Sequence, residues 1–122
     1  MEKKEQKQIA LIILQTINNL QAGKDKVASF LRGSHSKKNK SLRFKPGYGA
    51  LLWCDLLTIK GFIEQLKEME FIKQYQVERE FYSYPILTLT KAGEKALEEK
   101  MEIPLQKRRE IKLIKIGESE RT

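Results

Sequence analysis

Cationic and hydroxyl side chains are concentrated in one stretch of the chain, from Arg32 to Lys45. Lysine and arginine bind phosphate oxygens through charge-assisted hydrogen bonds, and serine hydroxyls can donate to the same oxygens. Such contacts hold a nucleic-acid backbone without reading its sequence. The stretch is therefore a candidate phosphate-binding site, the alternative being a solvated surface run. The residues expected at the phosphates are Arg32, Ser34, Ser36, Lys37, Lys38, Lys40, Arg43 and Lys45.

An aromatic cluster lies further along, between two segments with strand-like composition. Its members are Arg79, Phe81, Tyr82 and Tyr84. An aromatic ring can stack on an unpaired base for ~1–3 kcal/mol, enough to hold open a terminal base pair. We expect Tyr82 to be the leading ring, because Tyr84 adjoins Pro85, where the returning strand begins. The alternative is that these rings pack back onto the domain or onto a neighbouring protein.

A third candidate surface is the predicted helix from Asp55 to Glu70. Its exposed side is expected to carry Thr58, Lys60, Gln65 and Lys67. Of these, Thr58 and Lys60 are candidate DNA contacts. Base-specific reading is not favoured, because three carboxylates on this helix would repel a groove wall: Glu64, Glu68 and Glu70.

Catalytic and metal-binding groupings are missing from the sequence. The chain has one histidine, His35, and one cysteine, Cys54, so neither a zinc site nor a nucleophilic triad can be assembled. Gly23-Lys24 lacks the upstream glycine and the following hydroxyl of a nucleotide-gripping loop. We therefore expect no enzymatic activity, no cofactor and no metal.

One apolar segment, Leu51 to Cys54, precedes the predicted third helix. We expect Trp53 to be buried under that helix, an exposed partner-docking patch being the alternative. Cys54 is expected to be a small buried hydrophobic residue.

Composition limits the class of protein. The 122 residues suit one domain, and the net charge of +8 favours polyanionic partners. The longest apolar run, Ile9 to Leu14, is far shorter than the ~20 residues of a membrane span. The first five residues are charged and do not resemble a signal peptide. With a single cysteine, a cytoplasmic location fits best.

Hydrophobic periodicity predicts the elements that position these groups. The expected helices are Lys4–Gln21 ended by Gly23, Asp25–Arg32 ended by Gly33, Asp55–Glu70 with Asp55 as N-cap, and one from Thr90 to about Lys100. The expected strands are Ile72–Val77 and Pro85–Thr90, with Tyr75 and Val77 paired against Leu87 and Leu89. The order of helices and hairpin predicts a mostly helical α+β fold, a winged helix.

The domain is expected to span residues 1–101, followed by a basic tail, 102–122. The tail could be an edge strand, an amphipathic partner-binding segment or a disordered arm. Met1 and the tail suggest a complete chain, the alternative being a fragment of a longer helicase.

Four segments in order resemble the RQC domain, the winged-helix module of RecQ-family DNA helicases. They are Leu31-Arg32-Gly33-Ser34, Tyr48-Gly49, Phe62-Ile63-Glu64-Gln65-Leu66, and Leu89-Thr90-Lys91-Ala92-Gly93-Glu94-Lys95-Ala96-Leu97. The resemblance covers about Ile9 to Leu97. It departs from the family at Ala50–Cys54, which is apolar where relatives are polar, and at Ile59, which stands where relatives have a tryptophan.

The resemblance implies that Arg32, Ser34 and Ser36 lie at the phosphate backbone. It also implies that an aromatic residue at the wing tip separates strands, and that the protein takes part in DNA replication or repair. The helicase motor and the zinc-binding cysteines of many relatives are missing.

The sequence therefore predicts a non-enzymatic domain that binds duplex or junction DNA, with a helicase or another protein as a further partner through the tail. Two alternatives remain. One is a dimeric winged-helix transcription regulator, which would prefer a palindromic duplex. The other is a protein interaction module with a large exposed apolar patch.

Overall fold

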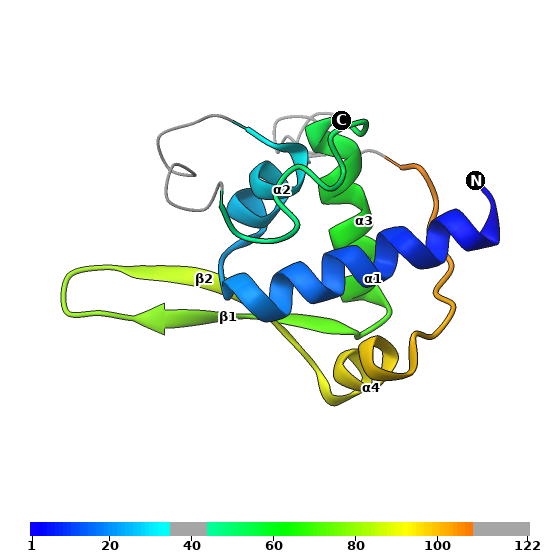
Figure 1. Ribbon diagram of the computed structural model, residues 1–122. Helices are drawn as coiled ribbons and strands as arrows, with labels where there is room; N and C mark the ends of the chain where they lie inside the picture. Colours follow the sequence, from blue (N-terminus) through cyan, green and yellow to red (C-terminus); the bar gives the residue numbers. More distant parts are fainter. Residues whose placement is uncertain (35–43, 109–122) are drawn as a thin grey trace, which may run out of the picture.

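The computed structural model describes residues 1–34 and 44–108 (Figure 1). Its elements follow the order α1 (Lys3–Leu20), α2 (Lys24–Arg32), α3 (Leu56–Glu68), β1 (Ile72–Glu78), β2 (Ser83–Leu89) and α4 (Lys91–Glu99). Three helices, a two-stranded antiparallel hairpin and a closing helix form a winged helix of the α+β class. This fold is the one that the sequence predicts.

The turn between α1 and α2 differs from the prediction. Gln21, not Gly23, adopts the left-handed conformation that ends α1, with φ of 49°. Gly23 is extended and is the N-cap of α2. A Cβ at Gly23 would lie 3.0 Å from the Pro85 carbonyl oxygen, so this position needs a glycine because β2 passes close by. The predicted role of Gly23 as the end of α1 is therefore wrong.

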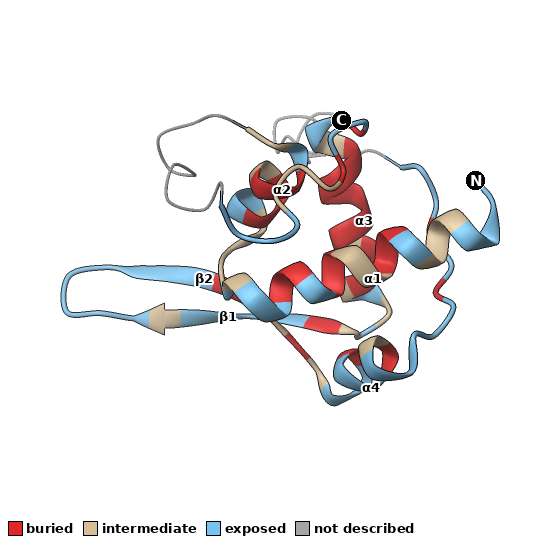
Figure 2. Ribbon diagram, in the orientation of Figure 1, coloured by how far each residue is buried: buried red, intermediate tan, exposed pale blue. Residues whose placement is uncertain are grey.

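The core forms where α1, α2 and α3 face one another (Figure 2). Leu14, Phe30, Phe62 and Ile63 are completely or almost completely buried there. At ~25 cal/mol for each Å² of apolar surface removed from water, such side chains supply most of the stabilisation of the helical body. The two capping predictions that concern α3 and α2 are confirmed. Asp55 accepts a hydrogen bond from the Thr58 amide at 2.8 Å, and Gly33 ends α2 with φ of 80°.

The hairpin forms the wing and projects from the helical body to the left in Figure 1. Its strands pair from Ile72↔Leu89 to Glu78↔Ser83, and the Arg79 amide donates to the Tyr82 carbonyl oxygen at 2.8 Å across the tip. The root is buried, while the outer part is exposed except for Val77, which is half-buried (Figure 2). The Leu87 amide, which donates to the Ala22 carbonyl oxygen at 2.9 Å, ties that root to the helices.

The predicted cross-strand pairing, with Tyr75 and Val77 opposite Leu89 and Leu87, is displaced by three residues from the observed one. Tyr75 lies opposite Ile86, and Val77 lies opposite Tyr84. Because side chains alternate between the two faces of a strand, this shift places Leu87 on the face opposite to Tyr75. The core favours the observed pairing, because this pairing directs Leu87 to the buried root of the wing. Pro85, paired with Gln76, lies within β2.

Residues 101–108 form neither helix nor strand and run back across the domain. The side chains of Ile103 and Leu105 are buried in the core, each 2% exposed. The side-chain amide of Gln65 donates to the Gln106 carbonyl oxygen at 2.7 Å and accepts from the Gln106 amide at 2.8 Å. This segment therefore covers one side of α3. The three alternatives for the tail concern mainly residues 109–122, which lie outside the described residues.

No helix in residues 1–34 and 44–108 combines the length and the apolar character that a membrane crossing demands.

Candidate nucleic-acid interface

The turn that ends α2 is held rigidly. Its two closing hydrogen bonds run from the Gly33 amide to the Phe30 carbonyl oxygen (3.1 Å) and from the Ser34 amide to the Ser29 carbonyl oxygen (3.0 Å). A Cβ at Gly33 would lie 3.3 Å from the Cα of Gly49, so the segment before α3 packs directly against this turn. The backbone positions of Arg32 and Ser34, which flank Gly33, are therefore fixed by this turn.

An aromatic pair supports the same turn from below. The Tyr48 hydroxyl donates to the Ser34 carbonyl oxygen at 2.8 Å. The ring of Tyr48 meets that of Phe30 edge to face, with centroids 5.6 Å apart. The predicted Tyr48-Gly49 motif thus has a physical role, because it joins the turn after α2 to the segment that leads into α3.

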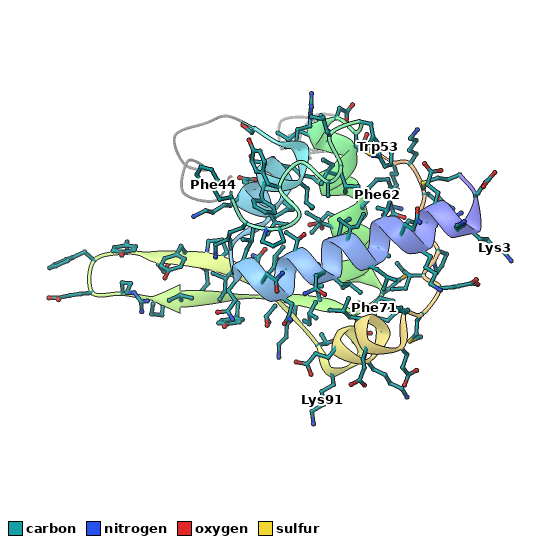
Figure 3. The ribbon with its side chains drawn as sticks, in the orientation of Figure 1. Lys3, Phe44, Trp53, Phe62, Phe71 and Lys91 are labelled. Carbon is teal, nitrogen blue, oxygen red and sulfur yellow. The ribbon has the colours of Figure 1, made fainter. Side chains whose placement is uncertain are left out.

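Arg32 has an exposed side chain in a defined position. Its Nη1 donates to the Leu52 carbonyl oxygen at 3.2 Å. A guanidinium has five N–H donors, so it can bind a phosphate while keeping this hydrogen bond. Lys45 and Phe44 are also exposed, Phe44 to 93%. Phe44 lies above the wing in Figure 3.

The rest of the predicted phosphate-binding stretch lies outside the described residues. These positions are His35, Ser36, Lys37, Lys38, Lys40 and Arg43. Their part in the interface stays a prediction.

Ion pairing separates the cations of the described chain into two groups. Those on α3 and next to it are paired with carboxylates: Lys24–Glu64 (3.2 Å), Lys60–Asp25 (2.8 Å), Lys67–Glu64 (3.9 Å) and Arg108–Glu68 (3.0 Å). Within residues 1–34 and 44–108, Arg32, Lys45 and Arg79 make no salt bridge, and neither do several exposed lysines elsewhere, among them Lys3, Lys26, Lys73 and Lys95. Arg32, Lys45 and Arg79 therefore have no carboxylate partner that would compete with a polyanion.

The prediction that α3 exposes Thr58, Lys60 and Gln65 is wrong. Their residual exposures are 9%, 8% and 7%. The periodic pattern of α3 correctly identified one apolar face, but α2 and residues 101–108 cover other sides of the helix. Lys60 is directed to Asp25 at the start of α2, and Gln65 to Gln106. Because they are buried, Thr58 and Lys60 are not part of the candidate interface.

The prediction that Trp53 is buried is also wrong, because Trp53 is 56% exposed and Leu52 62%. The turn before α3 has a period of about three, closed by the Cys54 amide donating to the Leu51 carbonyl oxygen at 2.9 Å. Leu51 and Cys54 therefore point inward, and the two residues between them point outward. Trp53 lies at the start of α3 in Figure 3.

Cys54 is buried, as predicted. Burial raises the pKa of its thiol above the ordinary value, against the opposite effect of the nearby Lys107 ammonium. The thiol therefore stays protonated at neutral pH, which is the state of an inert core residue.

The aromatic residues of the wing tip point into solvent. Phe81 is 87% exposed, Tyr82 62% and Tyr84 36%. The rings of Tyr82 and Tyr84 stack with centroids 6.0 Å apart, and the Arg79 guanidinium lies 5.8 Å from the centre of the Tyr84 ring. The sequence interpretation passed over Phe81 in favour of Tyr82. Strand pairing was the missing signal, because strands that end at Glu78 and start at Ser83 put Phe81 at the tip.

The chain matches a known protein family. A family model described as the RQC domain matches residues 1–113. No curated protein gives a significant match to the chain.

Proposed function

Since the chain belongs to the RQC domain family, we propose that it binds duplex DNA at or near a junction through phosphate contacts. RQC domains are non-catalytic winged-helix domains that generally bind nucleic acid. In this proposal the protein performs no chemistry. It holds the duplex at the turn after α2, and the wing lies at the duplex end. A cytoplasmic location and a part in DNA replication or repair belong to the same proposal.

The observation that carries the proposal is the position of Arg32 and Lys45, which are exposed at the two ends of the predicted phosphate-binding stretch and lie outside the ion pairs around α3. Arg32 and Lys45 lie on either side of the undescribed segment 35–43, whereas the cations around α3 are paired with carboxylates. In our proposal Arg32, Ser34 and Lys45 bind phosphates together with Ser36, Lys37, Lys38, Lys40 and Arg43. Since α3 is enclosed by other elements, the duplex is held by its backbone, with little reading of base sequence.

At the wing tip, the proposed strand-separating residue is Phe81. It is the most exposed ring of the wing, and an apolar ring at the tip can stack on the terminal base pair. Tyr82 is the weaker candidate because its ring stacks against Tyr84. Arg79, placed beside Tyr84, supplies a cation for the phosphate next to the frayed base.

Salt dependence tests the phosphate contacts. If about 5 phosphates are neutralised, a plot of log K against log salt should have a slope of roughly −4.5. Arg32→Ala should weaken binding to duplexes of any sequence and reduce the slope by about 0.9. Lys95→Ala is the matched control, because it removes the same charge from an exposed position on α4. A wild-type slope near zero would end the nucleic-acid proposal, and equal effects of the two variants would reject Arg32 as a specific contact.

The tip is tested with blunt and forked duplexes that carry a fluorophore pair at the terminus. Phe81→Ala should reduce opening of the last base pair while leaving the affinity for a long duplex almost unchanged. Tyr82→Ala should have the smaller effect. If both variants open the terminus as well as the wild type, the tip does not separate strands.

A second function, docking of a protein partner, is favoured by the exposure of Leu52 and Trp53 together with Leu56 (36%). Trp53 is the only tryptophan of the chain, so its fluorescence reports on this patch. We expect the emission to stay constant when duplex DNA binds, leaving the patch available to a protein. Strong quenching by DNA would instead make the patch part of the DNA interface.

A further inference from the structure

One face of the wing carries three tyrosine rings, spread from the tip to the middle of the hairpin. Residues opposite each other in an antiparallel pair share a face, and so do alternate residues of one strand. Tyr75 lies opposite Ile86, and Val77 lies opposite Tyr84. The bond across the tip joins Arg79 to Tyr82. We define the tyrosine face as Lys73, Tyr75, Val77, Arg79, Tyr82, Tyr84, Ile86 and Thr88.

The two faces of the wing differ in charge. The tyrosine face has two cations, Lys73 and Arg79, and no carboxylate among its eight residues. On the other face, beyond the buried root, lie Gln74, Gln76, Glu78, Ser83 and Pro85, which offer neither a ring nor a cation. A ligand whose flat apolar groups are joined by negative charges can bind the rings and cations of the tyrosine face. The opposite face offers such a ligand no aromatic ring and no cation.

The rings of the tyrosine face are exposed and partly fixed in place. Tyr75 is 48% exposed in the middle of the wing. Tyr84 is held between its neighbours, since the Tyr82 ring stacks on it and Nη2 of Arg79 reaches its hydroxyl oxygen at 3.3 Å. Successive positions on one face of a strand are ~6.8 Å apart, about twice the ~3.4 Å rise of stacked bases in one DNA strand. Tyr82 and Tyr84 are two such positions and stack on each other, so they form one aromatic platform, while Tyr75 on β1 offers a separate ring.

We propose that the tyrosine face binds two or three unpaired nucleotides of the DNA strand that leaves the duplex end. One base stacks on the outer side of the Tyr82–Tyr84 pair and another on Tyr75, while Arg79 and Lys73 contact the phosphates at the two ends of this path. The inference rests on the proposed function and deepens it. Phe81 would part the strands at the tip, and the tyrosine face would lead one of them away along the wing towards the helical body.

Unpaired DNA fits this face better than a duplex does. Bases within a duplex present only their edges in the grooves, so their flat faces cannot meet a row of tyrosine rings. Stacking on aromatic side chains next to cations is, in contrast, how proteins bind single strands without sequence preference. The alternative occupant of this face is a protein segment. In that case a tyrosine substitution would leave DNA binding unchanged in the test below.

The test compares a blunt duplex with the same duplex carrying a four-nucleotide overhang that contains 2-aminopurine. The wild type should bind the overhang duplex at least about fivefold more tightly, and the probe fluorescence should fall as its base stacks. Tyr75→Ala should remove most of this advantage without changing the affinity for the blunt duplex. Tyr75→Phe keeps the ring and should behave like the wild type. Gln76→Ala is the matched control on the opposite face.

Each outcome is decisive. If the wild type binds blunt and overhang duplexes equally, or if Tyr75→Ala and Gln76→Ala act alike, the tyrosine face does not bind a strand and the phosphate contacts still stand. If the wild type binds neither DNA, the proposed function itself fails. Should Tyr75→Ala unfold the wing, as seen by circular dichroism, Tyr75→Leu supplies an apolar side chain without a ring and should show the same selective loss.

Discussion

Gly93 lies where the first turn of α4 crosses the segment that leads into β1. Its amide donates to the Thr90 hydroxyl oxygen at 3.0 Å, which forms the N-cap of the helix. A Cβ at this position would overlap the carbonyl oxygen of Phe71 and lie 3.4 Å from the Cβ of Leu89. The glycine of the Leu-Thr-Lys-Ala-Gly segment therefore permits backbone to approach backbone closely.

We expect Gly93→Ala to lower the free energy of unfolding by about 1–3 kcal/mol, because the Phe71 backbone must move to admit the methyl group. This loss should exceed the gain of up to ~1 kcal/mol that alanine brings to a helix. Urea denaturation measures it. Glu94→Ala, an exposed change one residue further along α4, should have almost no effect. A Gly93→Ala variant as stable as the wild type would contradict the close approach.

At single positions, the sequence predicted local roles such as helix caps better than it predicted the solvent exposure of side chains. Cys54 and the caps Asp55 and Gly33 were predicted correctly, because each depends on local chemistry. Trp53 and Lys60 were not, because their exposure depends on which elements pack around the ends and sides of α3. A lysine in an amphipathic pattern is normally solvated, yet Lys60 is 8% exposed and paired with Asp25. Nothing local to residue 60 indicates that partner.

Among the elements, α3 is enclosed on more sides than its sequence pattern suggests. Gln65 is the clearest case, since its side-chain amide also donates to the Gly61 carbonyl oxygen at 3.2 Å besides its two bonds to Gln106. It joins α3 to a segment 41 residues further along the chain. The packing of residues 101–108 depends strongly on this one side chain.

Gln65→Ala should therefore destabilise the protein by about 1–3 kcal/mol, because it leaves the Gln106 backbone groups without their partner. It should also speed tryptic cleavage after Lys107 and Arg108, which the wild type holds close to α3. Gln15→Ala is the control, because the Gln15 side chain bonds only across an exposed part of α1, to Asn19. Equal cleavage rates for Gln65→Ala and wild type would show that apolar contacts alone hold the segment.

The bounds of the helices could be predicted to within about two residues, because glycine, proline and capping residues mark them. The strand register could not. It depends on which leucines of β2 reach the core, and a one-residue shift exchanges the two faces of the wing. The tyrosine face becomes visible only once Tyr75 is paired with Ile86. For the same reason the sequence placed Phe81 at the wing tip but did not rank it ahead of Tyr82.

For the whole molecule, the segment after α4 contributes to the core. The prediction that the domain ends at residue 101 can be tested against the burial of Ile103 and Leu105. Each buried aliphatic side chain contributes about 1.5–3 kcal/mol relative to an exposed one. The surface pair Arg108–Glu68 contributes at most about 1 kcal/mol.

Two truncations distinguish a domain that ends at residue 101 from one that includes residues 102–108. We expect removal of residues 109–122 to leave the melting temperature almost unchanged. Removal of residues 102–122 should cost about 3 kcal/mol or more of unfolding free energy, because two core positions and the Gln65 partner are lost together. Calorimetry of both variants and the full chain measures the difference. If the shorter variant is as stable as the longer one, the domain does end at residue 101.

The wing also leaves two strand edges uncovered by any third strand, since the described sheet has only β1 and β2. Exposed edges rich in aromatic residues invite copies of a protein to pair and aggregate. Pro85 in β2 has no amide hydrogen to donate, and charged residues, Lys73 and Glu78, lie near the two ends of β1. These features discourage edge-to-edge pairing. The protein can in this way display tyrosines to the solvent while remaining dispersed at high concentration.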